Sequence, residues 1–124
     1  HLNLALVLER QGKLEQAIKH YVKALQIKPN NTDAHNNLGN IWYRLGRTDK
    51  AYAHYLAAIK INPAYADAYN NLGTVSIRMG DPKRAVFFFE KALKINPESE
   101  SVQNNLNKAL SALEMIDDNS AVSN

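Results

Sequence analysis

The strongest constraint on the fold of this chain is a 34-residue period in its sequence. Six columns of matching residues follow it, and one extends into an incomplete fourth copy: Pro29, Pro63 and Pro97; Gly12, Gly46 and Gly80; Ala17, Ala51 and Ala85; Ala24, Ala58 and Ala92; Tyr21, Tyr55 and Phe89; Leu4, Leu38, Leu72 and Leu106. A unit of this length cannot bury its own hydrophobic face, so the copies are expected to stack on one another. The period therefore predicts one array of repeats.

Each copy has the pattern of two amphipathic helices joined by a glycine. In the second copy, apolar residues follow the i, i+3, i+4, i+7 spacing of one helix face on both sides of Gly46: Leu38, Ile41, Trp42 and Leu45 before it, and Ala51, Tyr52, Tyr55, Ala58 and Ile59 after it. Gly46 can take the positive φ that ends a helix, and Pro63 stops the second helix. The sequence thus predicts a series of helical hairpins.

The second and third copies resemble the tetratricopeptide repeat (TPR), whose signature has Trp-x-x-Leu-Gly-x-x-Tyr, then Ala-x-x-x-Phe, then Pro. The matching residues are Leu38-Gly39, Trp42, Gly46, Ala51, Tyr55, Ala58 and Pro63, and Leu72-Gly73, Gly80, Ala85, Phe89, Ala92 and Pro97. Two columns depart from the signature: His1, His35, Tyr69 and Gln103 in place of Trp, and Leu8, Trp42, Ser76 and Leu110 in place of Tyr. The resemblance implies an all-α, right-handed α-solenoid of helix-turn-helix hairpins with a C-terminal capping helix, and Ser76 is expected to mark a looser place in it.

We expect a TPR domain over residues 1–115, with repeats at about 1–31, 32–65 and 66–99 and a terminal helix over 99–115. Residues 116–124 are small and polar, which is typical of a disordered tail. Because the chain begins at His1 in the middle of the repeat pattern, we interpret it as a segment of a longer protein.

The most informative feature for function is a stripe of polar residues on the first helix of each copy. At about 100° per residue, this stripe lies roughly opposite the packing face. It holds an asparagine ladder and an arginine ladder, with one further asparagine: Asn3, Asn37, Asn71 and Asn105; Arg10, Arg44 and Arg78; and Asn40. The TPR resemblance implies that this stripe lines a concave groove in which extended peptides bind.

The chemistry of the two ladders indicates the kind of partner. A carboxamide has both a donor and an acceptor, so it can pair with a peptide backbone without reading side chains. An arginine adds charge-assisted bonds to carboxylates. The ladders therefore predict a protein-protein interaction module that binds an extended, somewhat acidic peptide.

A structural reading of the same columns stays open. Repeats descend from duplication, so a column can persist without a ligand, although Asn in a helix interior is less favourable than Ala by up to about 0.7 kcal/mol. Arg44 or Arg78 could instead pair with Asp33 or Asp67. The adjacent column of Asn36, Asn70 and Asn104 is expected to be solvated.

Two subfamilies of TPR sharpen this hypothesis. Repeats that bind chaperone C-termini have a carboxylate clamp, with Lys and Arg in the columns that here hold Asp67 and Asn71, so that subtype is disfavoured. The asparagine ladder and the phrase INPAYADAYNNLG resemble the repeats of O-linked N-acetylglucosamine transferases and of bacterial TPR scaffold proteins. This resemblance implies a further alternative, in which the chain is the substrate-guiding arm of a larger enzyme such as a glycosyltransferase.

The pair Phe87-Phe88 departs from the repeat pattern, because the earlier copies have Lys19-His20 and Ala53-His54 in these columns. Both rings are expected on the convex surface, where they would form an exposed apolar patch of the kind that marks an interface. The alternative function is therefore a scaffold that self-associates into a homo-oligomer through this patch or through its terminal edges.

Other kinds of chemistry have little support. His20 and His54 lie one repeat apart, without metal-ligand spacing, and are expected to be solvated, so no metal site and no cofactor are predicted. The sequence has no nucleophile, phosphate-loop or metalloprotease motif, which argues against an enzyme. A net charge of +3 without a basic block argues against nucleic acid, and no apolar run is long enough to insert in a membrane. We expect a cytoplasmic location.

Overall fold

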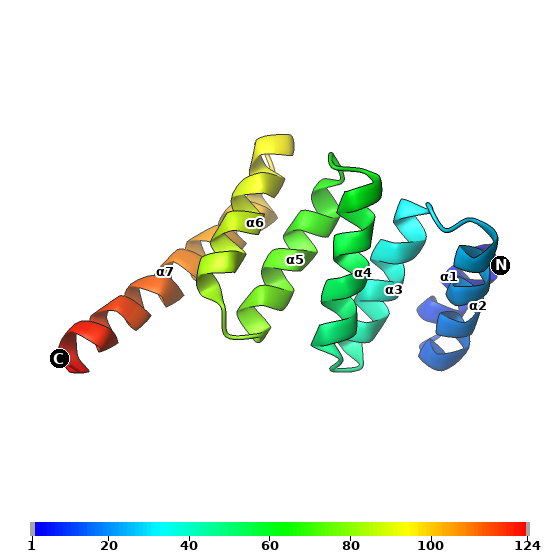
Figure 1. Cartoon of the computed structure of the whole chain (residues 1–124), viewed down its shortest axis with the longest axis horizontal. Helices are drawn as coiled ribbons and strands as arrows, with labels where there is room; N and C mark the ends of the chain where they lie inside the picture. The colour runs from blue at the N-terminus through cyan, green and yellow to red at the C-terminus, as the bar shows by residue number, and fades with distance from the viewer. Residues whose placement is uncertain (1, 124) are drawn as a thin grey trace. The chain divides into compact units, whose positions relative to one another are not determined.

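The computed structural model describes residues 2–123, and the side chains of residues 2–116. This part of the chain consists of seven α-helices, with no strand among them (Figure 1). They divide between two compact units, His1–Pro63 and Ala64–Asn124. The all-α fold class predicted from the helical spacing of apolar residues and from the TPR resemblance is confirmed.

The first unit contains the first two helical hairpins. Its helices are α1 (Leu2–Arg10), α2 (Leu14–Ile27), α3 (Thr32–Arg44) and α4 (Thr48–Ile61). Each helix packs against the next one along the chain. The helix α2 therefore contacts both α1 of its own repeat and α3 of the following repeat. The core around α1, α2 and α3 is formed by Ala5, Leu8, Ala17, Tyr21, Ala34, Leu38 and Ile41.

The second unit contains the third hairpin and the terminal helix, as α5 (Ala66–Arg78), α6 (Pro82–Ile95) and α7 (Glu100–Ser123). Here α6 packs against both α5 and α7. The buried residues around α6 and α7 are Ala85, Phe89, Ala92, Val102, Leu106 and Ala109. The terminal helix continues past the predicted end at residue 115. The predicted tail falls mostly on residues 117–124, whose side chains lie outside the described part, and it stays a prediction.

The three hairpin turns are built alike because each has a glycine at the same place. Gly12, Gly46 and Gly80 have φ values of 77°, 81° and 79°, the left-handed region that a side chain disfavours. After each glycine, a backbone N–H reaches back over the end of the helix: Lys13 to Leu8 at 2.9 Å, Arg47 to Trp42 at 2.8 Å and Asp81 to Ser76 at 2.9 Å. This pairing satisfies carbonyls that the helix leaves open, as in a Schellman motif.

Two further glycines set how closely the helices of a hairpin approach. A Cβ built on Gly39 would lie 2.7 Å from the ring of Tyr55, and one on Gly73 would collide with the ring of Phe89. Both rings are almost completely buried. The aromatic column therefore packs directly on the backbone of the first helix, which explains why Gly follows Leu in these two repeats.

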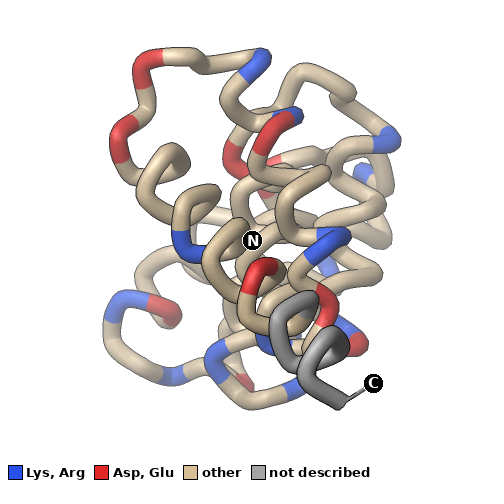
Figure 2. Tube along the Cα trace, turned by 90° about the vertical axis from the view of Figure 1, so that its left-hand side faces the viewer, with Lys and Arg blue, Asp and Glu red and all other residues tan. Residues whose placement is uncertain are grey.

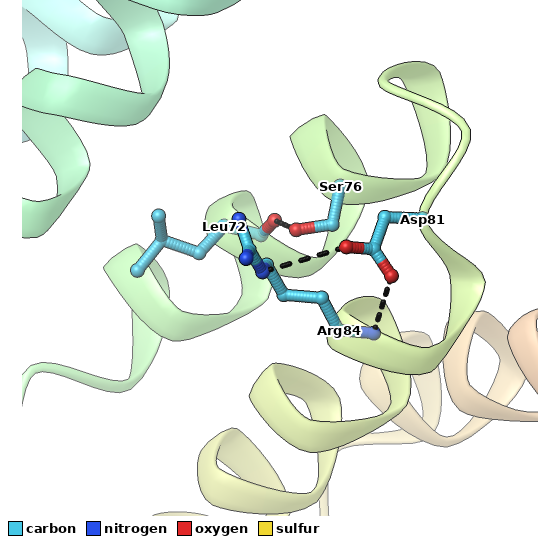
Figure 3. Close-up of polar contacts among 4 residues, drawn as sticks. All are labelled: Leu72, Ser76, Asp81 and Arg84. Carbon is cyan, nitrogen blue, oxygen red and sulfur yellow. Dashed lines mark hydrogen bonds and ion pairs between the residues drawn. The ribbon is translucent and has the colours of Figure 1, made fainter.

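Ser76 is fully buried, in a column where the signature has a ring. Its hydroxyl donates to the carbonyl of Leu72 at 2.8 Å, one helical turn back (Figure 3). The serine thus satisfies its own polar group at a position without exposure to solvent.

In the turn that follows, Asp81 caps α6, since its carboxylate accepts from the Arg84 backbone N–H at 3.1 Å and lies 3.5 Å from the Arg84 Nε (Figure 3).

Candidate functional site

In the first unit, the asparagine ladder is partly open to solvent. Asn3 of α1 is exposed, and Asn37 of α3 is half-buried. Asn3 lines a cavity of about 350 Å³, whose other walls come from α1, the end of α2 and the residue before α3: Leu2, Ala24, Ile27, Lys28 and Asn31. The first member of the ladder therefore borders a recess that can hold a small group.

Asn37 contacts the buried tyrosine of the preceding repeat. The hydroxyl of Tyr21 donates to Glu9 Oε1 at 2.9 Å. Burial raises the pKa of Tyr21 far above 10, the hydrogen bond and the charge of Glu9 raise it further, and a hydrogen bond from the Asn37 carboxamide acts in the opposite direction. Asn37 consequently has a bracing role inside the unit, and the part of its side chain that stays exposed can meet a ligand.

In the second unit, the ladder is linked to the adjacent asparagine column. Asn105 Nδ2 of α7 donates to Asn70 Oδ1 of α5 at 3.1 Å, and both residues are half-buried. The bond ties the first helix of one repeat to the first helix of the next. Asn71 is half-buried as well.

Asn40 is occupied by a hydrogen bond within its own hairpin. The hydroxyl of Tyr55 donates to Asn40 Oδ1 at 2.5 Å. Tyr55 is almost completely buried, and burial, with a smaller contribution from Tyr43, raises its pKa well above the ordinary value. The carboxamide oxygen of Asn40 therefore satisfies a core tyrosine, a role that the sequence analysis did not assign to it.

The arginine ladder occupies one structural position in every repeat. Arg10, Arg44 and Arg78 are the last residues of α1, α3 and α5, and all three are exposed. A cation at a helix C-terminus interacts favourably with the helix dipole, which gives this column a structural role in addition to any ligand contact.

The prediction that the adjacent asparagine column is solvated is wrong for Asn36. Its side chain is 5% exposed, whereas Asn70 is half-buried and Asn104 is exposed. A buried carboxamide requires hydrogen-bond partners, and no buried side-chain nitrogen or oxygen atom in the described part of the chain lacks one. Asn36 therefore lies on the buried face of α3, although it is adjacent in sequence to Asn37 of the ladder.

The expected patch of two exposed rings is also wrong in part. Phe87 is 55% exposed, but Phe88 is only 6% exposed. Phe88 packs edge-on against Phe87, with ring centroids 5.4 Å apart, and lies 6.5 Å from the ring of Tyr69. Adjacent residues of a helix point about 100° apart, so one ring faces solvent and the other turns toward α5. Of these two rings, only Phe87 contributes substantial exposed apolar surface.

His54, which was expected to be solvated, is half-buried and contacts a second histidine. His35 Nδ1 and His54 Nδ1 are 3.3 Å apart, and the ring centroids are 5.5 Å apart. His35 Nε2 lies 3.0 Å from the carbonyl oxygen of Pro29. Burial, then the charges of His35 and Lys50, lower the pKa of His54. Sequence reasoning missed this pair because it compared histidines within one column, whereas His35 and His54 come from different columns of one hairpin.

Larger clusters and long apolar helices do not occur in the described part of the chain. Among those residues, no group of three or more His, Cys, Asp or Glu side chains is placed to hold a metal ion. None of the helices searched there combines the length and the apolarity that a membrane span requires. Lys and Arg are interspersed with Asp and Glu along the trace (Figure 2).

Tandem helical hairpins with glycine turns and a buried aromatic column define a helical-repeat domain. The sequence matches the profile described as TPR repeat over residues 7–46 and 39–80, and the profile described as tetratricopeptide repeat over residues 66–99. These matches cover more than half of the chain, which belongs to the tetratricopeptide repeat family.

Solved TPR structures are closely similar in fold. The first TPR of Spaghetti (RPAP3) bound to the HSP90 peptide SRMEEVD is 25% identical, with a TM-score of 0.88, over 91% of this chain and 90% of that chain. The first TPR domain of human RPAP3 is 24% identical, with a TM-score of 0.88, over 94% of this chain and 92% of that one. The Sgt2 TPR domain of Aspergillus fumigatus is 23% identical, with a TM-score of 0.88, over 94% and 78%. A comparison with characterised protein sequences finds no match.

Proposed function

We propose that this chain is a protein-interaction module whose first helices bind an extended peptide with acidic side chains. The observation that carries the proposal is the similarity, over 91% of the chain, to a TPR domain that was solved with a bound peptide. That peptide, SRMEEVD, has three side-chain carboxylates. The peptide's negative charges are opposite in sign to the guanidinium groups of three exposed arginines, Arg10, Arg44 and Arg78.

The asparagine ladder supplies the backbone contacts in this proposal. Asn3 is exposed at a recess, while Asn37, Asn71 and Asn105 are half-buried. The internal bonds of Asn37 and Asn105 fix these side chains before a ligand arrives, which lowers the entropy lost on binding. At a net ~1 kcal/mol per hydrogen bond, four such contacts contribute only a few kcal/mol, so micromolar or weaker affinity is expected.

The residues in the clamp columns indicate how the peptide is recognised. Asp67 and Asn71 stand where chaperone-binding repeats have Lys and Arg. An aspartate repels a terminal carboxylate, so recognition in this proposal depends on acidic side chains along the peptide and not on its free C-terminus.

The test is fluorescence polarisation with SRMEEVD, with its C-terminally amidated form and with a library of unstructured acidic peptides. Arg44→Gln and Asn37→Ala are expected to weaken the best binder several-fold, while amidation has little effect. Lys23→Gln, an exposed residue of the second helix α2, is the matched control. Equal binding by Arg44→Gln, Asn37→Ala and the control would overturn the proposal.

A second candidate function is self-association through Phe87, which is favoured by its 55% exposure. Sedimentation at two protein concentrations separates the two candidates. A mass that rises with concentration and returns to the monomer in Phe87→Glu supports assembly, while a monomer at both concentrations excludes it. Phe88 is unsuitable for this test because it is buried.

The alternative of an enzyme's substrate-guiding arm uses the same ladder. It rests on the likeness of the asparagine column to that of O-linked N-acetylglucosamine transferases. Under this alternative, peptides enriched by the chain are themselves substrates of a transferase to which the chain is joined, and glycosylation of the enriched peptides by that enzyme is the test.

A further inference from the structure

We propose that His35 and His54 form a two-nitrogen binding site for a tetrahedral divalent metal ion, of which Zn²⁺ is the representative. The site lies in the second hairpin, with one ligand from the first turn of α3 and the other from α4. Its two donor atoms are the Nδ1 atoms of the two rings, 3.3 Å apart.

The separation of these atoms is compatible with a chelate. Two nitrogens that each lie about 2.05 Å from a tetrahedral Zn²⁺ are roughly 3.3 to 3.4 Å apart. A cis pair in a square-planar site would be only about 2.8 Å apart, so the distance favours Zn²⁺ over Cu²⁺. A hydrogen bond between the two rings also fits 3.3 Å, since one Nδ1–H can donate to the other Nδ1, and a bound metal ion would take the place of that proton.

The second observation is the contact that His35 makes with the backbone. Its Nε2 lies 3.0 Å from the Pro29 carbonyl oxygen, which can only accept, so Nε2 carries the proton. In the neutral ring this leaves the lone pair on Nδ1, the atom that faces His54. Metal-binding histidines are typically held in this way, by donation from the other ring nitrogen to a carbonyl or carboxylate.

The surroundings provide both a fixed support and space for further ligands. The start of α3 is anchored by Asn31, whose Oδ1 accepts from the Ala34 backbone N–H at 2.9 Å. A cavity of about 520 Å³ borders His35, with Pro29, Asn30, Ala57, Lys60 and Ile61 as its other walls. The cavity gives water access to the His35 side of the pair.

The corresponding place in the third hairpin shows that the fold does not require histidines there. The same two columns hold Tyr69 and Phe88, which keep a ring contact at 6.5 Å without a ring nitrogen. The histidines at these positions are therefore not required by the fold. His1 and His20 occupy these columns in the first copy.

The test is isothermal titration with Zn²⁺ in a His1→Ala/His20→Ala background, which removes the other two histidines of the chain. One equivalent of Zn²⁺ is expected to bind, and NMR is expected to show the Nδ1 resonances of both rings shifting together. His35→Tyr/His54→Phe, which copies the third hairpin, is expected to stay helical by circular dichroism and to weaken binding at least about tenfold.

A charge variant gives a second arm. The charge of Lys50 acts on His54, so Lys50→Gln is expected to tighten Zn²⁺ binding roughly two- to threefold. Unchanged binding by His35→Tyr/His54→Phe, or a shift confined to the Nε2 resonances, would overturn the proposal. Failure of the peptide test leaves this result untouched, because neither histidine belongs to the asparagine or arginine ladder.

Discussion

The second and third hairpins have the same backbone plan but different interiors. In the α3–α4 hairpin, the core tyrosine donates a hydrogen bond to Asn40 and two histidines meet between the helices. In the α5–α6 hairpin, Phe89 replaces the tyrosine, and Tyr69 with Phe88 replaces the histidines. One repeat is thus braced by polar contacts and the other by apolar packing. The difference shows which positions the fold fixes and which it leaves to individual chemistry.

The largest expected effect comes from the glycines against which the aromatic column packs. Gly73→Ala is expected to lower the free energy of unfolding by about 2 to 3 kcal/mol, because its Cβ collides with the buried ring of Phe89. Gly39→Ala should cost less, about 1 to 2 kcal/mol, since the Tyr55 ring lies somewhat farther away. Urea unfolding followed by circular dichroism measures both variants.

The control is the first repeat, which has Ala5 in the same column. Ala5→Gly removes a methyl group that this repeat accommodates, and the loss of helix propensity alone costs about 0.5 to 1 kcal/mol. A stabilising Gly73→Ala would mean that the ring of Phe89 can move away from the helix backbone.

The next largest change in stability is expected when a residue of the ring pair in one hairpin is replaced by its counterpart from the other hairpin. Phe88→His is expected to destabilise the chain by about 2 kcal/mol, because it removes buried apolar surface and introduces an imidazole opposite Tyr69. His54→Phe in the second hairpin should be close to neutral, since a ring contact with His35 is retained. Thermal unfolding of the two variants checks the asymmetry, and equal losses would contradict it.

A smaller loss of stability is expected when a core tyrosine is replaced by phenylalanine. Tyr55→Phe, which copies the third hairpin, should cost about 1 kcal/mol at neutral pH because the hydrogen bond to Asn40 is lost. The folded-state pKa values of Tyr21 and Tyr55 are raised above the unfolded value near 10. Their contribution is therefore complete below about pH 10 and is lost as the pH rises further, because only the unfolded tyrosines ionise there.

The measurement is the urea midpoint at about pH 8 and about pH 11. The midpoint of the native chain is expected to be lower at the higher pH than at the lower pH. The midpoint of Tyr21→Phe/Tyr55→Phe is expected to decrease less between the same two conditions. Parallel losses in both proteins would show that the fall has another origin.

The smallest effect concerns helix capping. Asp81 caps α6 through the Arg84 backbone N–H, whereas Arg47 occupies the same position before α4 and forms no side-chain cap. Arg47→Asp is expected to raise the free energy of unfolding by about 0.5 to 1 kcal/mol. Arg47→Ala is the control, because it loses the exposed contact with Asp49 without adding a cap. Equal midpoints for the two variants would contradict the prediction.

The sequence was sufficient for the fold because its period, turn glycines and apolar spacing all act locally. Gly46 ends α3 and the buried column contains Tyr55, as expected from the 34-residue pattern. The errors concern side chains at the edge of a helix face, where a difference of one residue decides burial. Phe88 and Asn36 are buried next to the more exposed Phe87 and Asn37, and the periodicity could not determine the rotation of each helix.

The site was less predictable because it depends on pairs from different columns. The asparagine and arginine ladders were visible in the sequence, but Asn40 is engaged by Tyr55 fifteen residues away, and Asn105 by Asn70 thirty-five residues away. The contact between His35 and His54 likewise depends on how closely α3 and α4 approach. These distances are set by packing in three dimensions, which a repeat alignment does not contain.

Trp42 has a practical consequence for optical experiments. It is the single tryptophan of the chain, it packs against the core of the first unit, and the ammonium group of Lys50 lies 4.2 Å from its ring centroid. Its emission therefore reports on the first unit alone, whereas far-ultraviolet dichroism reports on helices in both units. Unfolding curves that coincide for the two signals indicate that the units melt together, and curves that separate give the stability of each unit within the intact chain.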